Sequence, residues 1–549
     1  MARKYGVLKR PLNINELNTK KEKAKNNVLE KSIASIEKNG EDALEGMEIS
    51  PDIAQNRTTL NEIFKGCFDI GFREFAIGSG QTKCLLVYMD GAVNKDEINE
   101  NILKPLMNDI RLTSPDLIPE QQNLIEILKT TSISNNEVVD TKLMKDAVKH
   151  VLLGYCALFI DRNESGLSFA TKGWQHRSVQ DPTVEPVLRG PHDGFTEDLR
   201  VSTSLIRRRI KTPDLKMEKF EIGRLSKTEV VIAYVKGIAD DGILNELRQR
   251  LGRIDIDIIL DSSYIEHLIE DSPLSPFPQT EVTERPDSSA EAVTLGRFVI
   301  LVDGSPFALI VPTVFPRLLT SPEDNYVRAY YATFIRLLRY VAFALALLGP
   351  SLYIAITTFH QEMIPTSLLT TIAASRADVP FPAIVEALLM EITFDLIREA
   401  GERLPRYISQ SLSIVGVLVI GQTAVQAGLV SQAMVIVVSI TAIASFTIPK
   451  LNMSRSVRLL RFPIMILSAT LGIFGLIMGL LIILIHMASL RTYGVPYLSP
   501  LAPLTLEDWK SIVLRFPEWA LRKRPSFIQH NNLTREKEGL MPKPPSNDK

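Results

Sequence analysis

The spacing of apolar residues predicts alternating strands and helices in the first half of the chain. Two short runs with strand-like composition, Phe72 to Ile77 and Cys84 to Met89, precede a segment with helical spacing from Asn94 to Met107. The same alternation predicts further helices over Leu143 to Leu153 and Asp240 to Leu251, and further strands over Ala157 to Asp161, Glu229 to Lys236 and Asp255 to Leu260. We therefore expect an α/β region of small mixed sheets flanked by helices.

A proline-rich stretch interrupts this pattern at residues 271–286. Four prolines among polar residues exclude a continuous helix or strand, so the stretch is either a functional loop or a plain linker. After it, Arg297 to Val302 and Phe307 to Val311 flank Asp303-Gly304, which predicts a β-hairpin.

The second half contains long apolar runs that favour membrane helices. Leu337 to Phe359 has Arg339 as its only charged residue, and Pro350 is expected to kink it. Ile464 to Leu490 has His486 as its only ionisable residue, and Leu412 to Gly428 with Ala433 to Ile448 is expected to form a tight hairpin. These segments predict at least four membrane helices, although the shorter ones also fit buried core helices.

Basic residues indicate which side of the membrane the loops occupy. Clusters of Arg and Lys before Leu337 and between Ile448 and Ile464 should both lie in the cytoplasm. The basic tail, which includes Arg522 and Arg524, also favours that side. One crossing by Ile464 to Leu490 would place the tail outside, so the charge pattern and the number of spans conflict.

The composition agrees with two unlike halves. The 549 residues have a charged fraction of 23% and a mean hydropathy of +0.08, which a charged soluble half and an apolar half explain together. A formal net charge of -1 argues against a nucleic-acid partner. The three cysteines lack any Cys-x-x-Cys pair and indicate a reducing compartment, and no signal peptide is expected at the N-terminus.

These shifts in composition divide the chain into five parts. We expect a charged, disordered lead-in over 1–55, an α/β subdomain over 56–160, a second over 161–320 with its Pro-rich loop at 271–286, a helical membrane domain over 321–490, and an amphipathic, basic tail over 491–549.

The stretch from Pro380 to Pro405 carries the most informative charges. The prolines bracket one helix, whose acidic residues recur at helical spacing; the candidates for an ion path are Glu386, Glu391, Asp395 and Glu399. A carboxylate row between membrane spans is costly unless it meets water or a partner, so one interpretation is the lining of a cation path. The alternative is an amphipathic helix at the membrane surface, with its acids solvated or paired with arginines.

Other patterns are weaker. Glycines at 472, 475 and 479 (Gly472, Gly475 and Gly479) fit a helix-packing seam or the usual glycine content of membrane helices. The triplet Arg207, Arg208 and Arg209 fits a contact with lipid or another subunit, or a solvated helix face paired with nearby acids. Neither a metal site, a cofactor site nor an enzyme motif is predicted.

Several motifs together resemble the A subunits of GerA-type spore germinant receptors. The motifs are Val184 to Arg200 with Leu205 to Ile210, Ser275-Pro-Phe-Pro-Gln279, Thr283-Glu-Arg-Pro-Asp287, Asp303-Gly-Ser-Pro-Phe307, Ser321 to Tyr326, Phe359 to Thr366 and Pro380 to Pro405. The resemblance runs from about residue 55 to 505. Asn325 departs from it, since family members usually have tyrosine there.

The resemblance implies a multi-pass protein of the spore inner membrane, with its N-terminal domain on the cytoplasmic (spore core) side. It implies a permease-like B subunit and a lipoprotein C subunit as partners, together with membrane lipid. It also implies self-association, with a pentamer as one arrangement, into a nutrient-gated cation channel, and so favours the ion-path interpretation of the acidic helix. The alternatives are a non-conducting scaffold that couples nutrient-sensing subunits to a separate channel, and, more weakly, a secondary transporter.

Overall fold

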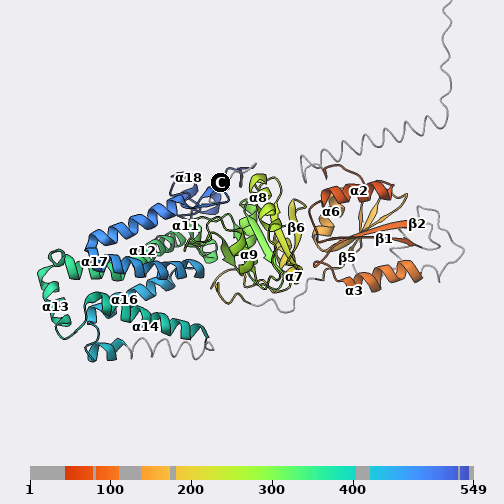
Figure 1. Ribbon diagram of the computed structural model, residues 1–549. Helices are drawn as coiled ribbons and strands as arrows, with labels where there is room; N and C mark the ends of the chain where they lie inside the picture. The colour runs from red at the N-terminus through yellow and green to blue at the C-terminus, as the bar shows by residue number, and fades with distance from the viewer. Residues whose placement is uncertain are drawn as a thin grey trace, which may run out of the picture.

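The computed structural model describes residues 44–77, 82–109, 138–173, 181–403, 421–528 and 532–542. Three bodies follow one another across the molecule: a first sheet with its helices, a second sheet with its helices, and a helical bundle (Figure 1). The predicted fold class, an α/β region followed by a helical region, is confirmed. Residues 1–43 of the expected lead-in lie outside the described residues, whereas Leu44 and Ile49 are buried in the first core.

The first subdomain is an antiparallel sheet covered by helices on both faces. Its elements are α2 (Ile53–Ile63), β1 (Ile70–Ile77), β2 (Thr82–Met89), α3 (Lys95–Ile98), η2 (Asn99–Leu103), η3 (Pro105–Asp109), β3 (Val138–Thr141), α6 (Met144–Leu152), β4 (Tyr155–Ile160) and β5 (Gly166–Ala170). Leu85 and Val87 face one core, whereas Cys84 and Leu86 face the other, as the two-residue period of a strand requires. The strand order is β1-β2-β4-β5-β3.

The second subdomain repeats this topology. Its elements are α7 (Leu199–Arg209), β6 (Leu215–Ile222), β7 (Thr228–Val235), α8 (Asp241–Gly252), α9 (Ser262–Ile269), β8 (Glu281–Thr283), α10 (Pro286–Thr294), β9 (Phe298–Val302) and β10 (Ala308–Val311). The strand order β6-β7-β9-β10-β8 matches the first sheet strand for strand. The predicted hairpin is confirmed, since β9 pairs with β10 in antiparallel register.

Three local expectations differ from the structure. Residues 255–260 form no strand, and Asp255 instead pairs with Arg224 beside the β6–β7 turn. Strand β5 completes the first sheet, so that subdomain extends past the expected boundary at residue 160. Strand β8 lies within the Pro-rich stretch, where pairing with β10 supplies its backbone partners.

The helical bundle follows the second sheet. Its elements are α11 (Phe315–Leu318), η5 (Pro322–Asn325), α12 (Ala329–Phe359), η6 (Gln361–Met363), α13 (Thr366–Arg376), α14 (Ala383–Arg403), α16 (Gln432–Phe446) and α17 (Leu451–Ser489). Among the described residues, α12 and α17 are long and apolar enough to cross a membrane, and α16 is a shorter apolar helix. Residues 412–420 of one expected span lie outside the described residues.

Helix α17 is a hairpin of two arms. Gly472 interrupts it with a φ of 62° and a ψ of -141°. In a straight helix Ser456 and His486 would lie about 45 Å apart. Instead the Ser456 hydroxyl donates to the Pro276 carbonyl, and His486 Nε2 lies 2.9 Å from Ser275 Oγ. Adjacent loop residues therefore contact both arms, so the arms run antiparallel, and the expected single span from Ile464 to Leu490 is corrected.

The tail returns to the second subdomain. It contains β11 (Arg491–Thr492), β12 (Val495–Pro496), α18 (Leu506–Trp509) and η7 (Glu518–Ala520). The Tyr493 amide donates to Asp271 at 2.7 Å, and Phe315 donates its amide to the Tyr497 carbonyl at 2.7 Å. The hairpin thus removes the conflict over the tail: two arms bring the chain back to the side of the α/β region (Figure 1).

Candidate functional site

The acidic helix α14 places its four candidate carboxylates in different surroundings. Glu386 is fully buried, accepts a hydrogen bond from the Ser431 amide at 2.8 Å, and lies 3.4 Å from Arg376. Glu391 is also buried and pairs with Arg461 in the first arm of α17. Both carboxylates therefore hold neighbouring elements together within one chain.

The other two acids of the row are more accessible. Asp395 lies 3.3 Å from Arg458 of α17 and is one-third exposed. Glu399 is 58% exposed and pairs with Arg403 one turn later at 2.6 Å. Helical spacing alone suggested one shared face, but only the C-terminal part of the row is available to water or an ion.

The three glycines of α17 pack within the chain. A Cβ atom at Gly472 would lie 2.8 Å from His360 Cε1, so both the backbone angle and the space require glycine there. Gly475 and Gly479 approach Leu467 of the opposite arm, where a Cβ at Gly475 would lie 2.0 Å from the Leu467 carbonyl oxygen. The close approach therefore joins the two arms of one hairpin.

The arginine triplet at the end of α7 divides into three separate environments. Arg207 is 1% exposed and binds the buried Asp69 through two hydrogen bonds of 2.8 and 3.0 Å, which join the two subdomains. Arg209 binds Asp193 at 2.6 Å. Because Arg207 is enclosed, it cannot contact lipid or another subunit as expected; Arg208 is the exposed member.

A buried group of charges connects the second subdomain to the start of α17. We call it the junction network, and it comprises Glu185, Glu281, Arg297, Arg317, Lys450 and Glu291. Lys450 lies 2.5 Å from Glu185 and 3.2 Å from Glu281. Arg297 binds the same Glu281 at 2.7 Å. A single buried carboxylate on β8 thus binds a cation next to β9 and a cation at the start of the α17 hairpin.

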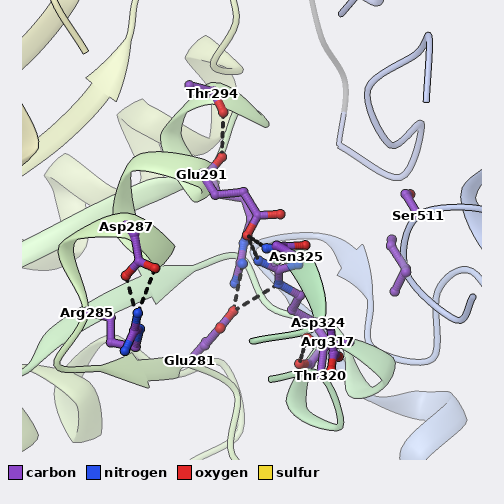
Figure 2. Close-up of polar contacts among 12 residues, drawn as sticks. Glu281, Arg285, Asp287, Glu291, Thr294, Arg317, Thr320, Asp324, Asn325 and Ser511 are labelled. Atoms are coloured by element: carbon purple, nitrogen blue, oxygen red, sulfur yellow. Dashed lines mark hydrogen bonds and ion pairs between the residues drawn. The ribbon is translucent and has the colours of Figure 1, made fainter. Parts of the chain in front are cut away.

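The network continues to the segment before α12. Arg317 lies 3.7 Å from Glu281 and 2.7 Å from Glu291, so it bridges the two acids (Figure 2). The Asn325 side chain donates to Glu291 at 3.0 Å. This hydrogen bond links the segment before α12 to α10.

The charges of the network stabilise each other's ionised forms. Burial alone would raise the pKa of Glu281, but Lys450, Arg297 and Arg317 hold it well below its usual range. Burial would likewise lower the pKa of Lys450, yet Glu185 and Glu281 raise it above its usual value. Removing one member would leave its partners buried without compensation, so the network resists separation of the two halves.

A second buried cluster fixes the start of α12. Asp324 accepts from Arg336 at 3.0 Å and from Arg339 at 2.7 Å. Arg336 also donates to the carbonyls of Ser511, Ile512 and Leu514 in the tail. The charge pattern by itself indicates a topological role for Arg336 and does not reveal this cluster; the motif from Ser321 to Tyr326, which contains Asp324, is the sequence signal for it.

Comparison with known proteins places the chain among spore germination proteins. The model for "Bacillus/Clostridium GerA spore germination protein" matches residues 58–527. The chain is 44% identical to spore germination protein KA of Bacillus subtilis (strain 168) over 90% of each chain. It is 38% identical to spore germination protein B1 of the same organism, over 87% of this chain and 98% of that protein.

One solved structure is also similar in sequence. It is the crystal structure of the N-terminal domain of the A subunit of the Bacillus megaterium spore germinant receptor GerK3. The two chains are 34% identical, and the match covers 49% of this chain and 97% of that one, with a TM-score of 0.40.

Proposed function

Because the chain belongs to the GerA family of spore germination proteins, we propose that it is the A subunit of a spore nutrient germinant receptor that forms an oligomeric, nutrient-gated cation channel. In this proposal it resides in the spore inner membrane with its α/β region in the spore core. A permease-like B subunit and a lipoprotein C subunit complete the receptor.

The observation that carries the proposal is the junction network. Gating requires that a change in the α/β region alters the membrane helices. Lys450 immediately precedes α17 and is held by Glu185 and Glu281 of the α/β region, so a shift of β8 displaces the hairpin directly. The tail adds a second connection through Arg336.

The exposed acids of α14 supply a chemical basis for cation passage. Asp395 and Glu399 are the accessible members of the row, and copies of them from several subunits would form rings of negative charge. The buried pairs of Glu386 and Glu391 would hold the helix in place.

The same buried pairs favour a second candidate, a non-conducting scaffold. Two of the four candidate carboxylates are already bound to partners within the chain, as in a purely structural helix. In this alternative the protein couples nutrient-sensing subunits to a separate channel.

Planar bilayers distinguish the two candidates. The full chain is reconstituted with and without its B and C subunits and with nutrient, and cation currents are recorded. The channel predicts nutrient-dependent currents whose cation selectivity falls in the double variant Asp395→Asn/Glu399→Gln. The control is Glu507→Gln, which neutralises an exposed acid in the tail. Absence of current from the assembled complex would support the scaffold, and unchanged selectivity would refute the assignment of these two acids.

A further inference from the structure

A cleft lies where the α/β region meets the first turn of α17. Its volume is about 300 Å³, at the lower end of the range of small-molecule sites. One wall is formed by Ser262 and Glu266 of α9 with Thr280, and the other by Asn452 and Arg455 of α17. The cleft thus presents an acidic and a basic group at the same junction.

Most charges around the cleft are already satisfied within the chain. Lys450 pairs with Glu185 and Glu281. Glu284 accepts hydrogen bonds from the amides of Thr183 and Val184 at 2.7 and 3.1 Å. These groups have little capacity left for a ligand.

Glu266 and Arg455 are different. Glu266 is 8% exposed and accepts a hydrogen bond from Thr280, but no basic side chain forms an ion pair with it in the part of the chain that the structure describes. Burial raises the pKa of this carboxyl group, as expected for an acid that lacks a cation. Arg455 is 53% exposed and has only a 4.0 Å contact with Glu402 among the described residues. The cleft can therefore take one cationic and one anionic group.

The surface below the cleft indicates where such a molecule comes from. Leu451, Arg455, Leu459 and Ile466 follow one another at intervals of four, four and seven residues, so they share one face of the first arm of α17. The three apolar members are 40%, 64% and 54% exposed. From Leu451 to Ile466 this face extends for about 22 Å, so an acyl chain can lie along it while its headgroup occupies the cleft.

We propose that the cleft binds the headgroup of a phospholipid that carries a primary ammonium group, such as phosphatidylethanolamine. The ammonium group donates to Glu266 and the phosphodiester accepts from Arg455 and Asn452, while an acyl chain follows Leu459 and Ile466. The bound lipid lies beside Lys450 and so adds a lipid contact to the junction network. The inference relies on the membrane placement in the proposed function, but it does not require conduction.

The test measures lipid binding to the purified full chain. Protein in detergent is titrated with phosphatidylethanolamine, its mono- and dimethylated forms, phosphatidylcholine and phosphatidylglycerol, and binding is followed by native mass spectrometry and by the shift in Tm. We expect phosphatidylethanolamine to bind about tenfold more tightly than phosphatidylcholine, because each methyl group removes a donor to Glu266.

Two variants test which side chains bind the ammonium group and the phosphodiester. Glu266→Gln should abolish the preference for phosphatidylethanolamine over phosphatidylcholine, and Arg455→Gln should weaken both phosphatidylethanolamine and phosphatidylglycerol about fivefold to tenfold. Arg522→Gln, whose side chain is also 53% exposed, is the matched control. If Glu266→Gln fails to fold, the methylated lipid series on the unaltered protein still decides the question.

Two results would overturn the proposal. Equal binding of all the lipids would show that lipids surround the protein without recognition of the headgroup. Binding of deacylated glycerophosphoethanolamine as tight as that of the intact lipid would show a site for a soluble zwitterion instead. Neither result bears on the channel, because currents are measured separately; conversely, absent currents would leave the lipid result unchanged.

Discussion

Arg461 of α17 and Glu391 of α14 form an ion pair in which each side chain is only 3% exposed. Arg461 also donates to the Ala346 carbonyl and the Ser445 hydroxyl, so one guanidinium connects four helices of the bundle. Glu391, which the charge pattern made a candidate for an ion path, is therefore enclosed among the packed helices of the bundle.

Removing either member of this pair should destabilise the bundle. Glu391→Ala should cost about 3–5 kcal/mol, because Arg461 is left buried without its counter-charge. The double variant Glu391→Met/Arg461→Met should recover much of the loss, which the Tm of the detergent-purified protein measures. Glu399→Ala, which removes an exposed pair, should change stability by less than about 0.5 kcal/mol. Equal losses from Glu391→Ala and Glu399→Ala would contradict the structure.

The reversal at Gly472 should not tolerate a side chain. Gly472→Ala would impose a φ of 62° on alanine and place its Cβ 2.8 Å from His360. We expect a cost of at least about 1–2 kcal/mol from the backbone alone, measured as a lower Tm. Gly252→Ala is the control, since a Cβ there meets nothing within 4 Å and the residue is helical. A Tm for Gly472→Ala equal to that of the control would argue against the reversal.

The antiparallel arms predict that the tail and the α/β region face the same side of the membrane. In a background without Cys67, Cys84 and Cys156, single cysteines at Lys510 and at Asp241, both exposed, should react with an impermeant maleimide in the same vesicle orientation. Reaction in opposite orientations would mean that α17 crosses once.

Substitutions of the buried and the exposed arginine of the triplet should differ in their effect on stability. Arg207→Met leaves Asp69 buried without its partner and should lower stability by about 3–5 kcal/mol. Arg208→Met affects an exposed side chain and should stay within about 0.5 kcal/mol of the unaltered protein. Thermal unfolding of the two variants, together with proteolysis between the subdomains, gives the comparison. The reverse order of stabilities would refute the assignment of Arg207 to the subdomain contact.

Glu270 should make stability depend on pH. Burial raises the pKa of Glu270 to about 7, so the folded chain holds a proton that the unfolded chain releases near pH 4.5. Stability should therefore fall as the pH rises from about 4.5 to 7, and then level off. Since this group is partly exposed, we expect a loss on the order of 1 kcal/mol. Glu270→Gln should reduce the slope of Tm against pH in this window, and an unchanged slope would assign the effect elsewhere.

Much of the architecture follows from local periodicity. Short continuous apolar runs such as Cys84 to Met89 marked strands that the structure confirms, because both faces of the sheet are buried against helices. The long apolar run that starts at Leu337 marked α12, because an uninterrupted apolar run of this length is typical of a membrane-spanning helix. The shared order of the two sheets was not visible, because it depends on strand pairing and not on residue identity.

The candidate site could be predicted only in part. The sequence by itself determined an α/β half, an apolar helical half and membership of a germination-protein family, since these depend on composition, spacing and motifs. Only the tertiary structure decided that α17 reverses at Gly472, since one glycine with positive φ looks like any other glycine in an apolar run. It also decided which acids are enclosed. Glu391 and Arg461 are 70 residues apart, and a charge's role depends on the partner and the solvent that the packed chain brings to it.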